Sequence, residues 1–403
     1  MRAAVLSLGL SLALATGAPA AAETLSAEIG RTGLAATEAR LTARGGLSDE
    51  ERFALGGIRF LRAIEQSFQI RWQNGMTDRT GMLPLLRLPV PDNPAPHPFD
   101  PGAVAAIFAA ADADLARARE ALAPIPAASD FGLVIDLGDL WFDVNANAAR
   151  DPGEDLLNIA GPALLGWQWS ERPADAPAPV VRFDSADAAW LIAYTHALQA
   201  FCQVVLAYDP TEPLTRILTT REALAAHGPL PPDLLLGSQN RGLDSIDMIA
   251  LILATLNQMP DAPRMAAARD HLLAAMVNNR DFWTRLAAET DSDREWLPKP
   301  GQTSALGVSL PEGTGESWQA VLADGEALLN GQKLAPYWRS GAGAGINVMK
   351  LFTEPRPVDL AGWIQGWAAM PYYEAGPLVS AENWSRFESL AGGQPMLLAL
   401  WFN

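Results

Sequence analysis

Residues 184–209 read DSADAAWLIAYTHALQAFCQVVLAYD, and this stretch decides the fold class. Asp184 and Ser185 are typical of a helix start, because their short polar side chains accept hydrogen bonds from the free backbone N–H groups of the first turn. A mostly apolar run follows to Val205, and Asp209-Pro210 ends it, since proline cannot continue a helix. The stretch therefore predicts one long helix.

A second helix is predicted after residue 48. Ser48 and Glu51 stand at the spacing at which two side chains cap each other's free amides. The apolar residues that follow form one stripe at helical spacing: Phe53, Ile58, Leu61, Ile64 and Phe68. Similar signals predict helices at 101–122, 213–226, 244–258, 262–288, 316–330, 358–370 and 381–391, and short strands at about 131–142, 179–184 and 396–402. We therefore expect a mainly α protein, a helical bundle or helical toroid with a few short strands.

The first residues have the order of a secretory signal peptide. Arg2 precedes an apolar run from Ala3 to Ala15, and small residues then continue to Ala22. This run is 13 residues long, shorter than the roughly 20 that cross a bilayer. We therefore expect cleavage of residues 1–22, no membrane span in the mature chain, and a periplasmic or secreted location. The single cysteine, Cys202, excludes an intrachain disulfide.

The mature chain is expected to divide near residue 290. Residues 23–290 are predicted to form a helical domain, and residues 291–403 a Trp-rich region that is either separate or part of the same domain. The polar segment 290–315 reads either as a linker or as a long active-site-type loop. The chain has 13 tryptophans, and Trp363 and Trp367 are four positions apart on the helix predicted at 358–370. Such aromatic residues either form a platform for a sugar ring or fill a helical core.

The charge of the chain argues against nucleic-acid binding. Lys and Arg number 29 against 46 Asp and Glu, which gives a net charge of −17 with no basic run. Neutralising several phosphates requires clustered Lys and Arg. The acidic surface favours solubility and concentrates divalent cations near carboxylates.

A twelve-residue segment from Asp143 carries a pattern of metal ligands. It reads DVNANAARDPGE, with oxygen-bearing side chains at positions 1, 3, 5, 9 and 12. Calcium takes about six to eight oxygen ligands, and a turn of this length supplies them. The predicted ligand set is Asp143, Asn145, Asn147, the carbonyl of Ala149, Asp151 and Glu154. We expect a structural calcium ion here; the alternative is an Asn/Asp-rich turn whose side chains cap its own backbone.

The stretch from Trp141 to Glu154 resembles the calcium loops of EF-hand proteins, of the dockerin type, and those of extracellular bacterial adhesin B-type repeats. The resemblance covers 14 residues and implies an ion site, not a fold for the whole chain. The loop departs from the EF-hand pattern at position 6, where the sharp turn favours glycine and this chain has Ala148. Ala148 must either hold a positive φ at a cost of about 1 kcal/mol or let the loop turn differently. Its flanks predict a strand before the loop and a helix only after Pro152.

Three residues of the 184–209 helix are catalytic candidates: Asp187, Tyr194 and His196. A Tyr and a His close together can supply an acid and a base, but the pattern favours the alternative, amphipathic core packing with a hydrogen-bonded His. The chain has no HExxH zinc motif and no Gly-x-Ser-x-Gly nucleophile motif.

Two functions therefore stay open from the sequence. The first is a calcium-stabilised exported protein that binds a small molecule, a glycan or an envelope component without chemistry of its own. The second is an exported carbohydrate-active hydrolase or lyase with a Trp-lined cleft. The enzyme predicts Tyr194 or His196 in one concave pocket beside Trp and acidic groups, whereas the binding protein predicts both residues in helix packing.

Overall fold

A computed structural model describes residues 23–76, 88–165, 167–173, 175–230, 243–302 and 304–391. The predicted signal peptide at 1–22 and the strand predicted at 396–402 lie outside these residues. The predicted mainly α fold is confirmed: the structure is 57% helical, with thirteen α-helices and two small two-stranded sheets in the described ranges. The helices are α1 Leu25–Ala43, α2 Asp49–Gln73, α3 Ala103–Leu122, α4 Leu156–Leu165, α5 Trp167–Glu171, α6 Ser185–Ala207, α7 Thr211–Ala225, α8 Ser245–Leu256, α9 Ala262–Ala288, α10 Thr314–Leu329, α11 Val348–Thr353, α12 Leu360–Gln365 and α13 Glu382–Leu390.

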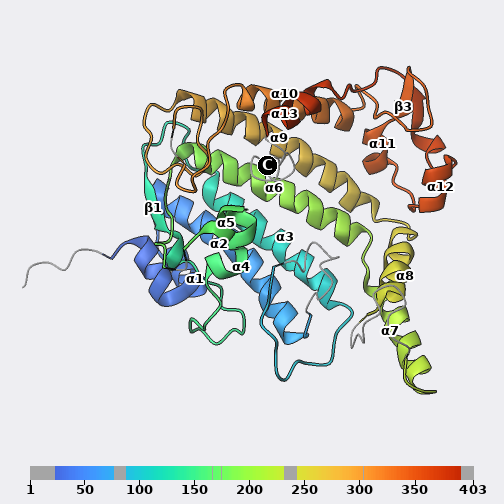
Figure 1. Ribbon diagram of the computed structural model, residues 1–403, viewed down its shortest axis with the longest axis horizontal. Coiled ribbons are helices and arrows are strands. Elements are labelled where there is room, and N and C mark those ends of the chain that lie inside the picture. Colours follow the sequence, from blue (N-terminus) through green and yellow to red (C-terminus); the bar gives the residue numbers. More distant parts are fainter. Residues whose placement is uncertain are drawn as a thin grey trace, which may run out of the picture.

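Four long helices pack as successive neighbours in the order α2, α3, α6 and α9 (Figure 1). Helices α10 and α13 continue beyond α9, and α7 and α8 pair with each other at one end of the molecule. Capping boxes start two of the long helices. Ser48 and Glu51 cap α2 reciprocally, as their spacing predicts, and Asp184, predicted at the start of α6, caps it together with Asp187.

Helix α6 lies in the interior of this layer, against α3 and α9. Among the described helices it alone has the length and hydropathy of a membrane span. Its place in the core explains its apolar composition, because a helix that is covered on several sides is apolar around most of its circumference.

Two predicted strands pair with each other. Strand β1, Leu133–Asp136, runs antiparallel to β2, Val180–Phe183, with Leu133 opposite Phe183. A 3-10 turn, η2 Leu137–Asp139, follows β1 directly. A second small sheet pairs β3, Ala344–Ile346, with β4, Tyr373–Ala375, and the 3-10 turn η3, Met370–Tyr372, precedes β4.

The main hydrophobic core continues past residue 291. It includes Phe68 and Phe282 from the long helices, Leu306 from the 290–315 segment, and Trp318 and Phe387 from α10 and α13. A smaller core around Ile346 and Tyr372 supports the second sheet.

One helix is shorter than its pattern predicts. Helix α12 ends at Gln365 instead of residue 370, because Gly366 takes φ 125°, a backbone conformation outside the helical region. Trp363 stacks on Tyr372, whereas Trp367 lies beyond the helix end and donates a hydrogen bond to Asp359 over 2.8 Å. The prediction that Trp363 and Trp367 share one face of a helix is therefore wrong.

Candidate functional site

The two ends of the 143–154 loop are held together by backbone hydrogen bonds. The N–H of Phe142 donates to the carbonyl of Glu154 over 2.9 Å, and the N–H of Leu156 donates to that of Leu140 over 2.9 Å. Helix α4 begins at Leu156, and the segment before the loop holds β1 and η2. The loop thus lies between a short strand and one helix, as its flanks predict.

Asp143 and Asn145 organise the first half of the loop. Asp143 Oδ1 accepts a hydrogen bond from the N–H of Asn147 over 2.9 Å, and its Oδ2 accepts from Ala148 over 2.9 Å. Asn145 Oδ1 also accepts from the N–H of Asn147, and Asn147 Oδ1 accepts from Ala149 over 2.8 Å. These hydrogen bonds hold the loop backbone around the side-chain oxygens of Asp143, Asn145 and Asn147.

Two alanines of the loop have a left-handed backbone. Ala146 and Ala148 both take φ 59°. An L-residue other than Asn or Asp rarely adopts this conformation without support from its surroundings. The loop therefore turns at position 6 with the positive φ that glycine supplies in an EF-hand loop.

Glu154 closes the loop from inside the protein. Its side chain is buried, and its two oxygens accept hydrogen bonds from the N–H groups of Val144 and Asp151, over 2.9 and 2.8 Å. Burial raises the pKa of Glu154, the carboxylates of Asp151 and Asp143 raise it further, and the two N–H groups oppose this shift. Asp151 Oδ2 accepts from the side-chain amides of Asn145 and Asn147, over 2.7 and 2.8 Å. The loop therefore gathers three carboxylates whose mutual repulsion a divalent cation would relieve.

The loop is attached to helix α2. The buried carboxylate of Glu65 accepts a hydrogen bond from the N–H of Asp143 over 3.0 Å, and Gln69 Nε2 donates to the Asp143 carbonyl over 2.7 Å. Phe142 packs edge-to-face on Phe68 with ring centroids 5.2 Å apart. An ion that stabilises the loop would therefore also stabilise its contacts with α2.

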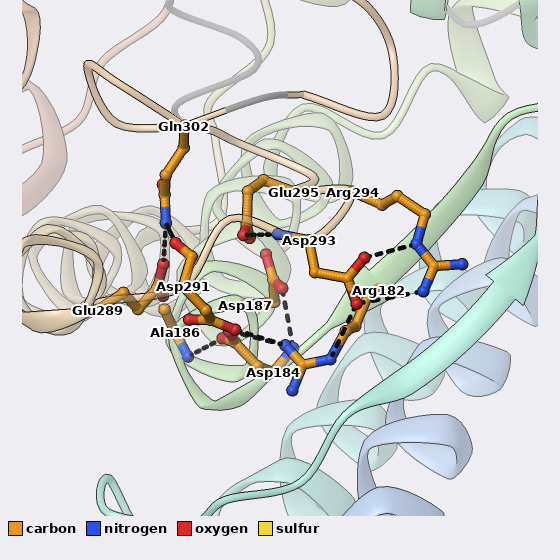
Figure 2. A network of polar contacts seen from close by, with 10 residues as sticks. All are labelled: Arg182, Asp184, Ala186, Asp187, Glu289, Asp291, Asp293, Arg294, Glu295 and Gln302. Atoms are coloured by element: carbon orange, nitrogen blue, oxygen red, sulfur yellow. Dashed lines mark hydrogen bonds and ion pairs between the residues drawn. The ribbon is translucent and has the colours of Figure 1, made fainter.

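A second group of acidic residues lies where α6 begins and α9 ends. This carboxylate cluster comprises Asp184, Asp187, Glu289 and Glu295 (Figure 2). One carboxylate oxygen each of Asp184, Glu289 and Glu295 lies within 4.8 Å of the others. The N–H of Asp184 donates to Asp187 Oδ2 over 3.0 Å. The cluster combines the N-terminal cap of a helix with two residues from the segment that follows α9.

Burial raises the pKa of every member of the carboxylate cluster, and like charges add to the shift. The pKa of Glu289 rises to about 7, although a hydrogen bond from Gln302 lowers it. The pKa of Asp187 lies well above its usual range because of its burial and the neighbouring Asp184. Such an arrangement either shares protons among its oxygens or holds a divalent cation.

One cation stands at the rim of the carboxylate cluster. The Arg182 guanidinium lies 4.0 Å from Asp184, 3.3 Å from Asp291 and 3.9 Å from Asp293 (Figure 2). Sequence reasoning singled out Asp184 and Asp187 as part of one helix start, but it did not connect them with Glu289 and Glu295. The acidic run at 289–295 was the signal, and it was interpreted as a linker or an active-site-type loop.

The structure separates Tyr194 from His196. The Tyr194 ring packs between Phe60 and Trp190, with centroid distances of 5.7 and 5.2 Å, and burial raises its pKa. His196 Nδ1 lies 2.9 Å from Nδ1 of His271 on α9. His196 also lines a polar cleft beside Arg119, away from the apolar surroundings of Tyr194. The two side chains therefore do not form an acid–base pair with each other.

Cys202 and the tryptophans of the C-terminal region do not form a further site among the described residues. Cys202 is buried, and burial raises the pKa of its thiol to about 12. Trp384 packs against Phe387, whereas Trp338 and Trp367 are exposed, so these three tryptophans do not share one environment.

Comparison with known proteins gives no relative for this chain. No family model, no curated protein and no solved structure matches it.

Proposed function

We propose that this protein is an exported, calcium-stabilised α-rich protein that binds a ligand without catalysing a reaction. The observation that carries the calcium site is the loop geometry: buried Glu154 faces two further carboxylates, and Ala148 holds the positive φ of the turn. Asp143, Asn145, Asn147, the Ala149 carbonyl, Asp151 and Glu154 would hold the ion. Bound calcium would neutralise the loop and tie β1, α4 and α2 together.

The surroundings of Tyr194 and His196 support binding over catalysis. Among the described residues, Tyr194 shares a cavity with Trp190 and Trp296 but with no acid. His196 pairs with His271 and shares a cleft with Glu120 and Asp281 but with no Trp. The ligand of such a protein is an unknown small molecule, glycan or envelope component. An acidic chain with no basic run disfavours polyanionic partners.

Thermal unfolding of the mature chain in excess calcium and in chelator tests the calcium site. A ligand that binds only the folded state stabilises it by about 2.7 kcal/mol at 100 times its Kd. We expect the unfolding midpoint to rise in calcium for the wild type and for Asp270→Asn, whose side chain is exposed on α9. Glu154→Gln is expected to abolish the rise. Equal midpoints in calcium and chelator for the wild type would overturn the calcium site.

A second candidate function rests on the carboxylate cluster. A carboxyl group with a pKa of about 7, as in Glu289, is suited to general acid catalysis at neutral pH, so an exported hydrolase is the alternative. Turnover of an envelope glycan by the wild type, lost in Glu289→Gln and retained in Glu382→Gln on the surface of α13, would favour this alternative. Turnover that survives Glu289→Gln would exclude the cluster as its catalytic group.

A further inference from the structure

An apolar cavity of about 340 Å³ lies inside the main core. Its wall comes from α2 and α6, from the β1–β2 sheet and η2, from residues of α1 and α4, from Leu88, Leu140 and Phe142, and from Trp296 of the 290–315 segment. Every described residue that lines it is aliphatic, aromatic or glycine, and all of them are buried or half-buried. The cavity is thus lined by side chains of the core and not by exposed ones.

A cavity of this size is unusual in a packed interior. Protein cores are packed as densely as organic crystals, and few of their voids exceed the size of a water molecule. Water gains little in an apolar cavity, because a buried water needs two or more polar partners. An apolar cavity of about 150 Å³ already binds benzene, and ligand pockets start at about 300 Å³. The cavity described here therefore has the size and the lining for an organic molecule.

The shape of the wall indicates an extended ligand. On α2 the lining runs from Phe53 to Ile64, which at about 1.5 Å per residue is a length of about 16 Å. On α6 the lining covers little more than one turn, from Trp190 to Tyr194. The length of the wall along α2 suits an extended hydrocarbon chain.

Gly57 contributes open space to the cavity. It lies within α2, and a Cβ placed on it would meet no atom of another residue within 4 Å. Its neighbour Gly56 differs, because a Cβ there would clash with Leu122. A larger side chain at Gly57 would therefore enter the cavity without displacing the neighbouring helix.

The polar features of the cavity indicate the head of the ligand. Tyr194 supplies the one hydroxyl among the described lining residues, and no described residue forms a hydrogen bond with it. The carboxylate cluster begins next to the lining: Asp184 follows Phe183, and Glu295 precedes Trp296. The described lining itself holds no charged side chain, so an ionised head would be buried without a partner at a high cost in free energy. An uncharged oxygen that accepts a hydrogen bond from Tyr194 suits both features.

We infer that the cavity binds an uncharged lipid-like molecule, with an extended hydrocarbon chain along α2 and a hydroxyl, ester or amide oxygen at Tyr194. This inference rests on the proposed ligand-binding function and names the chemical class of the ligand. It excludes a glycan as the occupant of this cavity, because the wall offers a sugar almost no hydrogen-bond partners.

Titration of the calcium-loaded mature chain with 1-decanol, followed by tryptophan fluorescence, tests the inference, since Trp190 and Trp296 line the cavity. We expect saturable binding of 1-decanol, weaker binding of decanoate, and none of maltotriose. Gly57→Leu is expected to weaken 1-decanol binding at least tenfold, whereas Gly57→Ala, the control at the same position, retains it. Tyr194→Phe is expected to weaken 1-decanol by about fivefold, the range of one hydrogen bond, and to leave decane unaffected.

Three results would overturn the inference: no saturable binding of 1-decanol, equal binding by the wild type and Gly57→Leu, or a preference for decanoate. Helix α2 remains intact in both Gly57 variants, because replacing glycine inside a helix favours the helical state. The calcium site is tested by a separate measurement, the unfolding midpoint. Binding of 1-decanol without calcium stabilisation would remove the calcium site only, and calcium stabilisation without 1-decanol binding would remove the cavity inference only.

Discussion

The backbone N–H of Ala148 donates a hydrogen bond to Oδ2 of Asp143 over 2.9 Å, and it does so while Ala148 holds φ 59°. The contact fixes the turn that brings the second half of the loop back toward the first. Its cost falls on Ala148, whose Cβ is crowded in this backbone conformation. Position 6 is therefore strained, as is position 4, where Ala146 also takes φ 59°.

Ala148→Gly is expected to stabilise the protein and to tighten calcium binding. Glycine adopts a positive φ without the Cβ conflict, which relieves about 1 kcal/mol, less the extra entropy of glycine in the unfolded chain. Urea unfolding with and without calcium measures the change. Ala149→Gly is the matched control and is expected to destabilise, because Ala149 does not have a positive φ. Equal losses of stability in both variants would contradict the strain at Ala148.

Local signals predicted most of the helices. The capping box of Ser48 and Glu51 was predicted from its spacing, Asp184 was predicted as the start of α6, and the bounds predicted for 262–288 coincide with α9. The turn of the 143–154 loop, which brings its two ends together, is likewise a local structure. Its calcium ligands and the calcium ion itself stay predictions.

Contacts between distant segments were not predictable in this way. Asp184 and Glu289 meet because the start of α6 lies beside the end of α9, and neither helix pattern states which ends adjoin. Gln69 reaches the loop for the same reason. The end of α12 depends on the conformation of Gly366, which the apolar spacing of its neighbours does not reveal.

Glu289→Gln is expected to change how stability depends on pH. The folded pKa of Glu289 is about 7 and lies above the usual 4.5, so the folded state binds more protons between these values. This contribution to stability is full below pH 4.5 and is lost as the pH rises through 7. After allowance for partial exposure, we expect the wild type in chelator to lose about 1 to 2 kcal/mol over this window through Glu289. Urea unfolding at a series of pH values measures it.

The Glu289→Gln variant is expected to show a flatter profile and higher stability at pH 8 than the wild type. Glu382→Gln, an exposed position on α13, is expected to keep the wild-type slope. The same change of stability between pH 5 and pH 7 in the wild type, in Glu289→Gln and in Glu382→Gln would contradict the raised pKa of Glu289.

His196 is expected to have the opposite effect on acidification. Burial lowers its pKa to about 3, with contributions from the charges of Arg119 and His271, so the unfolded state binds more protons between pH 3 and 6.5. The protein therefore gains stability through this group as the pH rises, fully by about pH 6.5, and loses it toward pH 3. Burial also lowers the pKa of His271 on α9, although the charges of Asp112 and Asp270 raise it. The surroundings of both histidines therefore oppose protonation.

We expect His196→Gln to reduce the loss of stability between pH 6.5 and pH 4 by about 1 to 2 kcal/mol, with His97→Gln, at an exposed histidine, as the control. Unfolding in urea across this range, combined with the NMR titration of the imidazole protons, measures both the slope and the pKa; titration of His196 near pH 6.5 in the folded protein would contradict its burial beside Arg119.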